Sequence, residues 1–267
     1  MSKLLFIGAG KMASAIAGGI VSAKLFSADE ISAYDISSAA AAAFTAATGV
    51  ACVSEIAPAL ADAEKVLIAV KPQYLDAALR PLQGKFGGKL VISIVAGVTL
   101  ETLSALTGTE KIVRVMPNTP ALVGKGAAAY AGGAGADEED LKFVSDIFNA
   151  AGIGLQVPEK LLDAVTGLSG SGPAYVFEFI QALADGGVAE GLPRDTALQL
   201  AAQTVLGAAA MVLETGTHPA VLKDQVTSPG GTTSRGLEKL AEKGFSGIVM
   251  QAVRAASSRS AELGKKK

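Results

Sequence analysis

The first half of the chain alternates short apolar runs with stretches that carry apolar residues at helical spacing. The apolar runs predict buried strands at residues 4–8, 30–34, 66–70, 90–95 and 112–116. Strands that are apolar on both sides, with helices between them, are typical of a parallel sheet covered on both faces. We therefore expect an α/β domain here.

After Pro158 the pattern changes to helices alone, with apolar residues at i, i+3 and i+4. The helices are expected at residues 161–185, 194–214 and 233–263, the last of them split near Gly244. Several carry apolar residues on more than one face, so they need a partner to cover them. We predict two domains, 1–158 with the sheet and 159–267 all-helical, and a homodimer formed through the second.

A glycine-rich turn follows the first predicted strand directly. Gly8, Gly10 and Ala13 have the spacing G-x-G-x-x-A and lead into a helix. In this context the glycines allow a tight turn and a close approach of a pyrophosphate to the helix N-terminus. The second predicted strand ends at Asp35, where such folds place an acid that binds ribose hydroxyls. The pattern predicts a Rossmann-type doubly wound sheet that binds a dinucleotide.

Two further motifs follow predicted strands, A-V-K-P at residues 69–72 and R-V-M-P-N-T-P at residues 114–120. A proline after a strand can simply end it, which is the plainer interpretation of either motif alone. The carboxyl ends of parallel strands meet at one edge of the sheet, where such folds bind ligands. Together, the strand ends favour a binding site.

The helical half contains two segments rich in Gly, Ser, Thr and Pro, at residues 166–175 and 224–233. Such composition also occurs in ordinary loops. The second segment, however, precedes a predicted helix, and residues 228–233 read S-P-G-G-T-T. Successive backbone N–H groups and hydroxyls at a helix N-terminus suit a carboxylate.

Composition and charge narrow the function classes. The net charge of -2 gives no field that would attract nucleic acid, and the single cysteine, Cys52, excludes an internal disulfide. No membrane span or secretory signal is expected, and we predict a cytoplasmic protein. His218, the one histidine, is expected to cap a helix or face solvent. The acidic run at residues 137–140 is expected to lie at the start of a helix, where negative charge is favourable. We therefore expect no metal site.

The strings G-A-G-K-M-A, A-V-K-P, R-V-M-P-N-T-P, T-G-L-S-G-S-G-P-A-Y and T-S-P-G-G-T-T occur in this order between residues 8 and 233. In order and separation they resemble the motifs of pyrroline-5-carboxylate reductases, and the chain has the length typical of that family. The last three strings are the specific ones. The resemblance implies reduction of L-1-pyrroline-5-carboxylate to L-proline with NADPH or NADH, in a homodimer whose active sites combine the nucleotide domain of one chain with the 228–233 loop of the other.

The resemblance and the motifs together assign the site residues. Thr233 is expected near the ring nitrogen as the catalytic contact. The substrate carboxylate is assigned to Ser228, Gly230, Gly231, Thr232 and Thr233. The cofactor is assigned to Gly8, Gly10, Lys11, Met12, Asp35, Ser37, Val70, Lys71, Pro72, Ala96, Asn118 and Pro120.

Cofactor choice is a separate expectation. Asp35 would repel a 2′-phosphate, and there is no arginine between Ser27 and Cys52, so we expect NADH to be used at least as well as NADPH. The serines after Asp35 could still donate to a phosphate, and Asp35 could be a turn residue without influence on this choice.

Two other functions compete. A dehydrogenase of small hydroxy acids would need a base, yet there is no lysine between Leu161 and Leu222. A non-catalytic dinucleotide sensor would not need the 228–233 loop.

Overall fold

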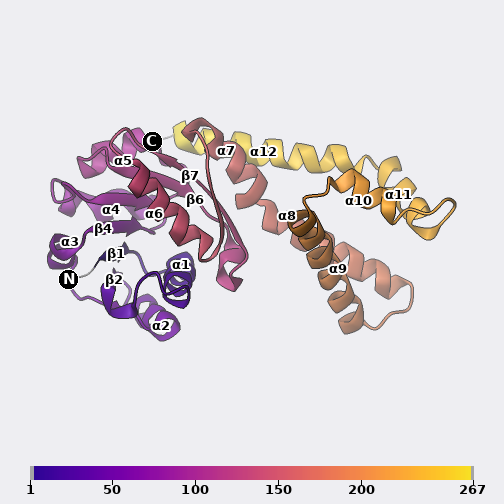
Figure 1. Cartoon of the computed structure of the whole chain (residues 1–267), viewed down its shortest axis with the longest axis horizontal. Helices are drawn as coiled ribbons and strands as arrows, with labels where there is room; N and C mark the ends of the chain where they lie inside the picture. Colours follow the sequence, from indigo (N-terminus) through magenta and orange to yellow (C-terminus); the bar gives the residue numbers. More distant parts are fainter. Residues whose placement is uncertain (1–2, 266–267) are drawn as a thin grey trace. The chain divides into compact units, whose positions relative to one another are not determined.

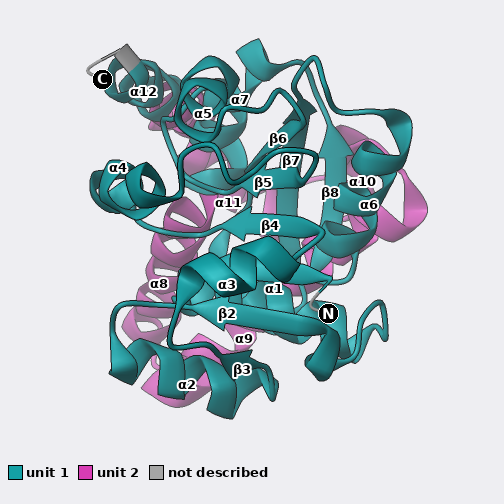
Figure 2. Ribbon diagram, turned by 90° about the vertical axis from the view of Figure 1, so that its left-hand side faces the viewer, with its two compact units in different colours: residues 1–171, 254–267 teal, residues 172–253 magenta. Residues whose placement is uncertain are grey.

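The structure is a computed structural model that describes residues 3–265. It contains two compact units, shown in different colours in Figure 2. The first, which we call the sheet unit, comprises Met1–Ser171 and Arg254–Lys267. The second, the helical unit, comprises Gly172–Val253.

The sheet unit is built on eight strands in the order β3-β2-β1-β4-β5-β6-β7-β8. Figure 1 labels several of them, among them β1, β4 and β7. All neighbouring strands are parallel except β6 and β7. The strands are β1 (Leu4–Ile7), β2 (Ile31–Tyr34), β3 (Ala51–Cys52), β4 (Lys65–Ile68), β5 (Leu90–Ser93), β6 (Ile112–Met116), β7 (Gly126–Gly132) and β8 (Gly152–Gln156). The chain order reverses between β1 and β4, the switch point at which such sheets bind ligands.

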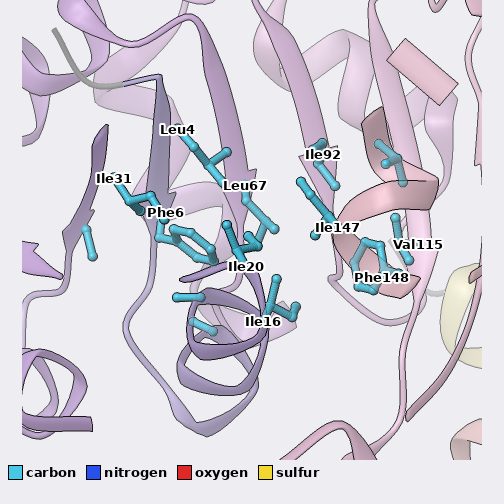
Figure 3. Packing of buried hydrophobic residues seen from close by; sticks show 14 of the residues in the cluster. Leu4, Phe6, Ile16, Ile20, Ile31, Leu67, Ile92, Val115, Ile147 and Phe148 are labelled. Carbon is cyan, nitrogen blue, oxygen red and sulfur yellow. The ribbon is translucent and has the colours of Figure 1, made fainter. Parts of the chain in front are cut away.

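Helices cover both faces of this sheet, as the apolar pattern predicted. They are α1 (Lys11–Ser22), α2 (Ser38–Thr48), α3 (Ile56–Asp62), α4 (Leu75–Leu79), α5 (Leu100–Thr107), α6 (Glu138–Asn149) and α7 (Leu162–Val165). On one face, Leu4 and Phe6 of β1 belong to the same apolar cluster as residues of α1 and α6, and Phe6 lies next to α1 (Figure 3). The opposite face packs Leu5 and Ile7 of the same strand against residues of α3, α4 and α5. Because side chains alternate along a strand, burial on both sides requires apolar residues at every position.

A third, smaller cluster lies on β7. Ala129 and Ala131 contact Leu162 of α7, with Met116 at the margin. The C-terminal part of α12 (Phe245–Lys265) also belongs to the sheet unit. There, the Ser260 hydroxyl donates to the Asp163 carboxylate at 2.6 Å.

The helical unit contains long helices with little buried surface of their own. Its helices are α8 (Gly172–Ala189), α9 (Arg194–Thr215), α10 (Pro219–Gln225), α11 (Thr232–Glu242) and the first part of α12. Its apolar cluster contains Ala184, Ala197 and Ala201, and is therefore made of small side chains. Several large apolar side chains of α9 are exposed, among them Leu206 and Leu213.

Most predicted elements form, with informative differences. Strands β3, β7 and β8 were not predicted. β3 has two residues, β7 consists of Gly and Ala apart from Tyr130, and β8 has glycine at two of its five positions. Glycine and alanine have low strand propensity. The predicted helix at 161–185 is interrupted by a π-helical turn, Thr166–Gly170. The predicted break near Gly244 separates α11 from α12, and Gly244 has a φ of 69°.

The division of the chain differs from the predicted one at residue 158. Residues 159–171 belong to the sheet unit, as does the end of α12. The reason is packing, because α7 covers β7 and Ser260 is tied to Asp163. Neither contact leaves a signal in the local sequence.

One described helix differs from the expectation of no membrane span. By length and composition alone, α9 could cross a membrane. Only 11% of its apolar 18-residue stretch is buried within the chain. An exposed apolar helix can also be covered by a partner protein.

Candidate active site

The glycine-rich turn forms where β1 meets α1, and its two glycines meet different needs. Gly8 has a φ of 105°, and a Cβ there would lie 2.8 Å from the carbonyl carbon and oxygen of Ala69 at the end of β4. A side chain at Gly8 would therefore collide with a neighbouring backbone. Gly10 has an ordinary backbone conformation, and no atom of residues 3–265 outside its immediate neighbours lies within 4 Å of a Cβ there. The space beside Gly10 is open.

Helix α1 begins directly after this open space. Gly10 is its N-cap and supplies no side-chain hydrogen bond, so the first-turn N–H groups at Lys11 and Met12 have no side-chain cap. Ala13 is buried and lets α1 approach the sheet closely. Free N–H groups at a helix N-terminus attract an anion. The turn therefore fits the pyrophosphate of a dinucleotide.

Asp35 lies beside this turn and holds it in shape. Its carboxylate accepts hydrogen bonds from the Ala9 N–H at 2.8 Å and from the Ser37 N–H at 2.9 Å. Ser37 is the N-cap of α2, and its hydroxyl accepts from the Ala40 N–H. The structure thus brings Asp35 and Ser37 next to the glycine-rich turn. The hydrogen bond to Ser37 is the turn role that the sequence left open for Asp35, whereas the hydrogen bond to Ala9, 26 residues away, was not predicted.

The ends of β4 and β5 contribute the next predicted residues. Val70 and Pro72 are half-buried, whereas Lys71 and Ala96 are exposed. Since these residues follow parallel neighbouring strands, they lie at the same edge of the sheet as Gly8.

The end of β6 is different, because its predicted residue is buried. Asn118 is 8% exposed and bonded at both ends of its amide. Its oxygen accepts from the Ala127 N–H at 2.8 Å, and its nitrogen donates to the Ser169 carbonyl at 3.0 Å. Pro120 lies in the 3-10 turn Thr119–Val123 that follows. The Asn118 amide therefore links three segments of the sheet unit.

The predicted carboxylate loop forms in the helical unit at the start of α11. Gly230 has a φ of 68°, and the Gly231 N–H donates to the Ser228 carbonyl at 3.0 Å, closing a turn. Gly231 is the N-cap of α11 and supplies no side-chain hydrogen bond. Thr232 and Thr233 occupy the first turn, and Thr233 is half-buried.

This loop leaves polar groups available. Among the described residues, the Thr233 hydroxyl has no hydrogen-bond partner within the chain. The Ser234 hydroxyl, by contrast, donates to the Gly231 carbonyl at 2.7 Å. Uncapped N–H groups together with a free hydroxyl can bind a carboxylate and a neighbouring polar atom.

Two features that the sequence interpretation singled out as structural, the histidine and the acidic run, have that role. The His218 imidazole accepts from the Ala220 N–H and caps α10, which confirms the expected cap. Asp137 and Asp140 form a reciprocal capping box at the start of α6.

The sequence interpretation missed an ion pair under the strand ends. Arg114 of β6 donates to Glu159 at 3.1 Å, and the same Glu159 oxygen accepts from the Leu100 N–H at 2.7 Å. The signal available beforehand was an arginine inside a run that is otherwise apolar.

Comparison with known proteins agrees with this geometry. The family described as "Pyrroline-5-carboxylate reductase dimerisation" matches residues 159–263, and "NADP oxidoreductase coenzyme F420-dependent" matches residues 3–97. The second match covers strands β1 to β5 of the sheet unit. A pyrroline-5-carboxylate reductase from Methanosarcina acetivorans is 49% identical over 99% of this chain and 98% of its own.

Solved structures agree over the whole length. The NADP-bound pyrroline carboxylate reductase of Plasmodium falciparum has a TM-score of 0.88 and 37% identity, covering 98% of both chains. The pyrroline-5-carboxylate reductase of Coxiella burnetii has a TM-score of 0.92 and 33% identity, also covering 98% of both. The fold, the glycine-rich turn and these relatives therefore all indicate a nicotinamide cofactor. The chain belongs to the pyrroline-5-carboxylate reductase family.

Proposed function

We propose that this chain reduces L-1-pyrroline-5-carboxylate to L-proline with a reduced nicotinamide cofactor. The observation that carries the proposal is the uncapped N-terminus of α11, with the free Thr233 hydroxyl, in a chain that also has an open glycine-rich turn. The first suits a small carboxylate and the second a dinucleotide. A sensor that only bound the dinucleotide would need the second alone.

The residues have separate tasks in this reaction. The bound cofactor supplies a hydride to the imine carbon. Ser228, Gly230, Gly231 and Thr232 hold the substrate carboxylate through hydroxyls and backbone N–H groups. The Thr233 hydroxyl contacts the ring nitrogen, which must carry or receive a proton before the carbon accepts hydride.

The second group of residues is assigned to the cofactor. Lys11 and Met12 present first-turn N–H groups to the pyrophosphate, and Asp35 and Ser37 face the adenosine ribose. Val70, Lys71, Pro72, Ala96, Asn118 and Pro120 form the strand-end side of the site. Because Asp35 is an acid beside the ribose, NADH is used at least as well as NADPH.

The functional protein is a homodimer with active sites shared between chains. Support comes from the match of residues 159–263 to a dimerisation family and from the exposed apolar side chains of α9. Covering α9 with a second copy explains its apolar surface in a soluble, cytoplasmic enzyme. Each site takes the sheet unit from one chain and the 228–233 loop from the other.

The test measures oxidation of NADH and NADPH at 340 nm with pyrroline-5-carboxylate as substrate. We expect turnover with this substrate, none without it, and a fall in kcat of about ten- to a hundredfold in Thr233→Ala, because one positioned polar contact is lost. Thr233→Ser should retain most of the rate. A cofactor that binds while its absorbance stays flat would support the dinucleotide sensor instead.

Sharing of the site has its own test. Gly10→Ala and Thr233→Ala chains are each defective, but a mixed dimer would contain one site with both parts intact. Co-expression should therefore restore activity. A mixed dimer as inactive as either parent would place both halves of the site in one chain.

A further inference from the structure

Three residues at alternate positions on one face of β6 and its extension contact the segment that leads to the helical unit. Arg114 pairs with Glu159, and Asn118 bonds the Ser169 carbonyl. Met116, between them, lies so close to Gly170 that a Cβ there would be 2.6 Å from the methionine methyl. Residues 159–170 are therefore fastened to the sheet unit along this strand.

The Asn118 contact differs from the other two because both the oxygen and the nitrogen of its side-chain amide are hydrogen-bonded. The amide oxygen accepts from Ala127 at the start of β7, and the amide nitrogen donates to Ser169. A buried amide bonded in two directions has one orientation only. Asn118 thus has a fixed structural partner on each side of the strand end.

The partner on the second side is a carbonyl that the helix itself leaves unbonded. Residues Thr166–Gly170 form a π-helical turn, closed by the Ser171 N–H donating to the Thr166 carbonyl at 2.8 Å. In the regular α-helical pattern the Ser169 carbonyl would accept from residue 173. Residue 173 is proline, which has no N–H. The Asn118 amide supplies the missing donor.

We propose that Asn118 is a positioning residue, which holds the π-helical turn against the end of β6 by donating to the carbonyl that Pro173 leaves unpaired. It joins the two family-specific motifs R-V-M-P-N-T-P and T-G-L-S-G-S-G-P-A-Y through one hydrogen bond. This refines the role of Asn118 from a group that touches the cofactor to one that sets the position of the strand end beside it. The effect on turnover rests on the proposed function.

The test is a double-mutant cycle of Asn118→Ala and Pro173→Ala. Alanine at 173 restores a backbone N–H, so the Ser169 carbonyl no longer depends on Asn118. We expect Asn118→Ala to lower kcat about tenfold in the native background and less than about threefold in the Pro173→Ala background. The loss of the Ala127 contact is common to both backgrounds and cancels.

A matched control and two further measurements keep the outcomes separate. Asn149 also accepts from a backbone N–H, of Gly154 at 2.8 Å, and donates to Ser145 at 3.2 Å, but it lies at the α6–β8 connection. Asn149→Ala should leave kcat within about twofold of the native value. The urea midpoint should show the same coupling between residues 118 and 173, whether or not the chain reduces pyrroline-5-carboxylate.

The affinity for reduced cofactor, followed by its fluorescence, should change less than about threefold in Asn118→Ala. Equal losses of kcat in both backgrounds, or a cofactor affinity at least about tenfold weaker that Pro173→Ala does not restore, would show direct contact with the cofactor and overturn the proposal.

Discussion

The sheet unit and the helical unit differ in how far their large apolar side chains are buried. In the sheet unit, Phe6, Ile16 and Leu67 are completely buried between strands and helices of the same chain (Figure 3). In the helical unit, Leu206 and Leu213 of α9 are 55% and 75% exposed. Burying a leucine side chain is worth about 1.5–3 kcal/mol. The first unit thus has a complete core, whereas the second leaves large apolar side chains exposed, which the proposed dimer would cover.

The largest expected effect comes from changing the exposed face of α9. Leu206 and Leu213 are seven residues apart and share a helix face. Leu206→Glu with Leu213→Glu should abolish the dimer and lower activity more than about a hundredfold, because charge would enter an apolar interface. Light scattering after size exclusion measures the mass. The matched change Ile36→Glu, at an exposed apolar residue of the sheet unit, should leave the mass unchanged. An intact dimer in the α9 variant would show that the exposed face of α9 is not the dimer interface.

A second prediction separates fold from binding within the sheet unit. Gly8→Ala should destabilise the unit by about 2–3 kcal/mol, because the new Cβ meets the Ala69 backbone at a φ unsuited to alanine. Gly10→Ala should leave the thermal midpoint nearly unchanged and weaken cofactor binding at least about tenfold, since its Cβ enters the open space. Thermal unfolding and fluorescence titration check both. Equal effects of the two changes would mean that the turn has only one role.

A third prediction concerns cofactor choice. The native ratio of kcat/KM should favour NADH or be even, and Asp35→Ser should shift it toward NADPH by about tenfold, or 1.4 kcal/mol. Since Asp35 also accepts from Ala9, the variant should be slightly less stable. Asp35→Asn, which removes the charge and keeps an acceptor, separates the two effects. A native preference for NADPH of about tenfold or more would show that Asp35 does not govern the choice.

The smallest expected effect is on acid stability. The Glu30 carboxylate accepts from Lys3 and from Ser27, and these contacts hold its pKa at about 2, below the usual 4.5. A carboxyl whose pKa is lowered on folding stabilises the fold above the unfolded pKa, and this contribution is lost as the pH falls toward the folded pKa. Glu30→Gln should therefore reduce stability at pH 7 slightly and flatten its decline between about pH 4.5 and pH 2. Urea titrations across that range test this, and an unchanged slope would exclude the contribution.

The parts predicted from sequence are those that local chemistry controls. The apolar runs that form β1, β4 and β5, the turn at Gly8 and Gly10, and the break at Gly244 each depend on neighbouring residues. The weak strands β7 and β8 could not be predicted, because glycine and alanine carry little strand signal and these strands form by pairing with each other and with β6.

The order of the local elements and the presence of a dinucleotide turn therefore follow from the amino-acid pattern, since strand and helix periods and glycine geometry are short-range properties. Only the tertiary structure determined that residues 159–171 return to the sheet, that Asp35 accepts from Ala9, and that Asn118 donates to the Ser169 carbonyl. These outcomes depend on polar groups far apart in sequence that find each other only after the chain folds, because buried donors and acceptors must be paired.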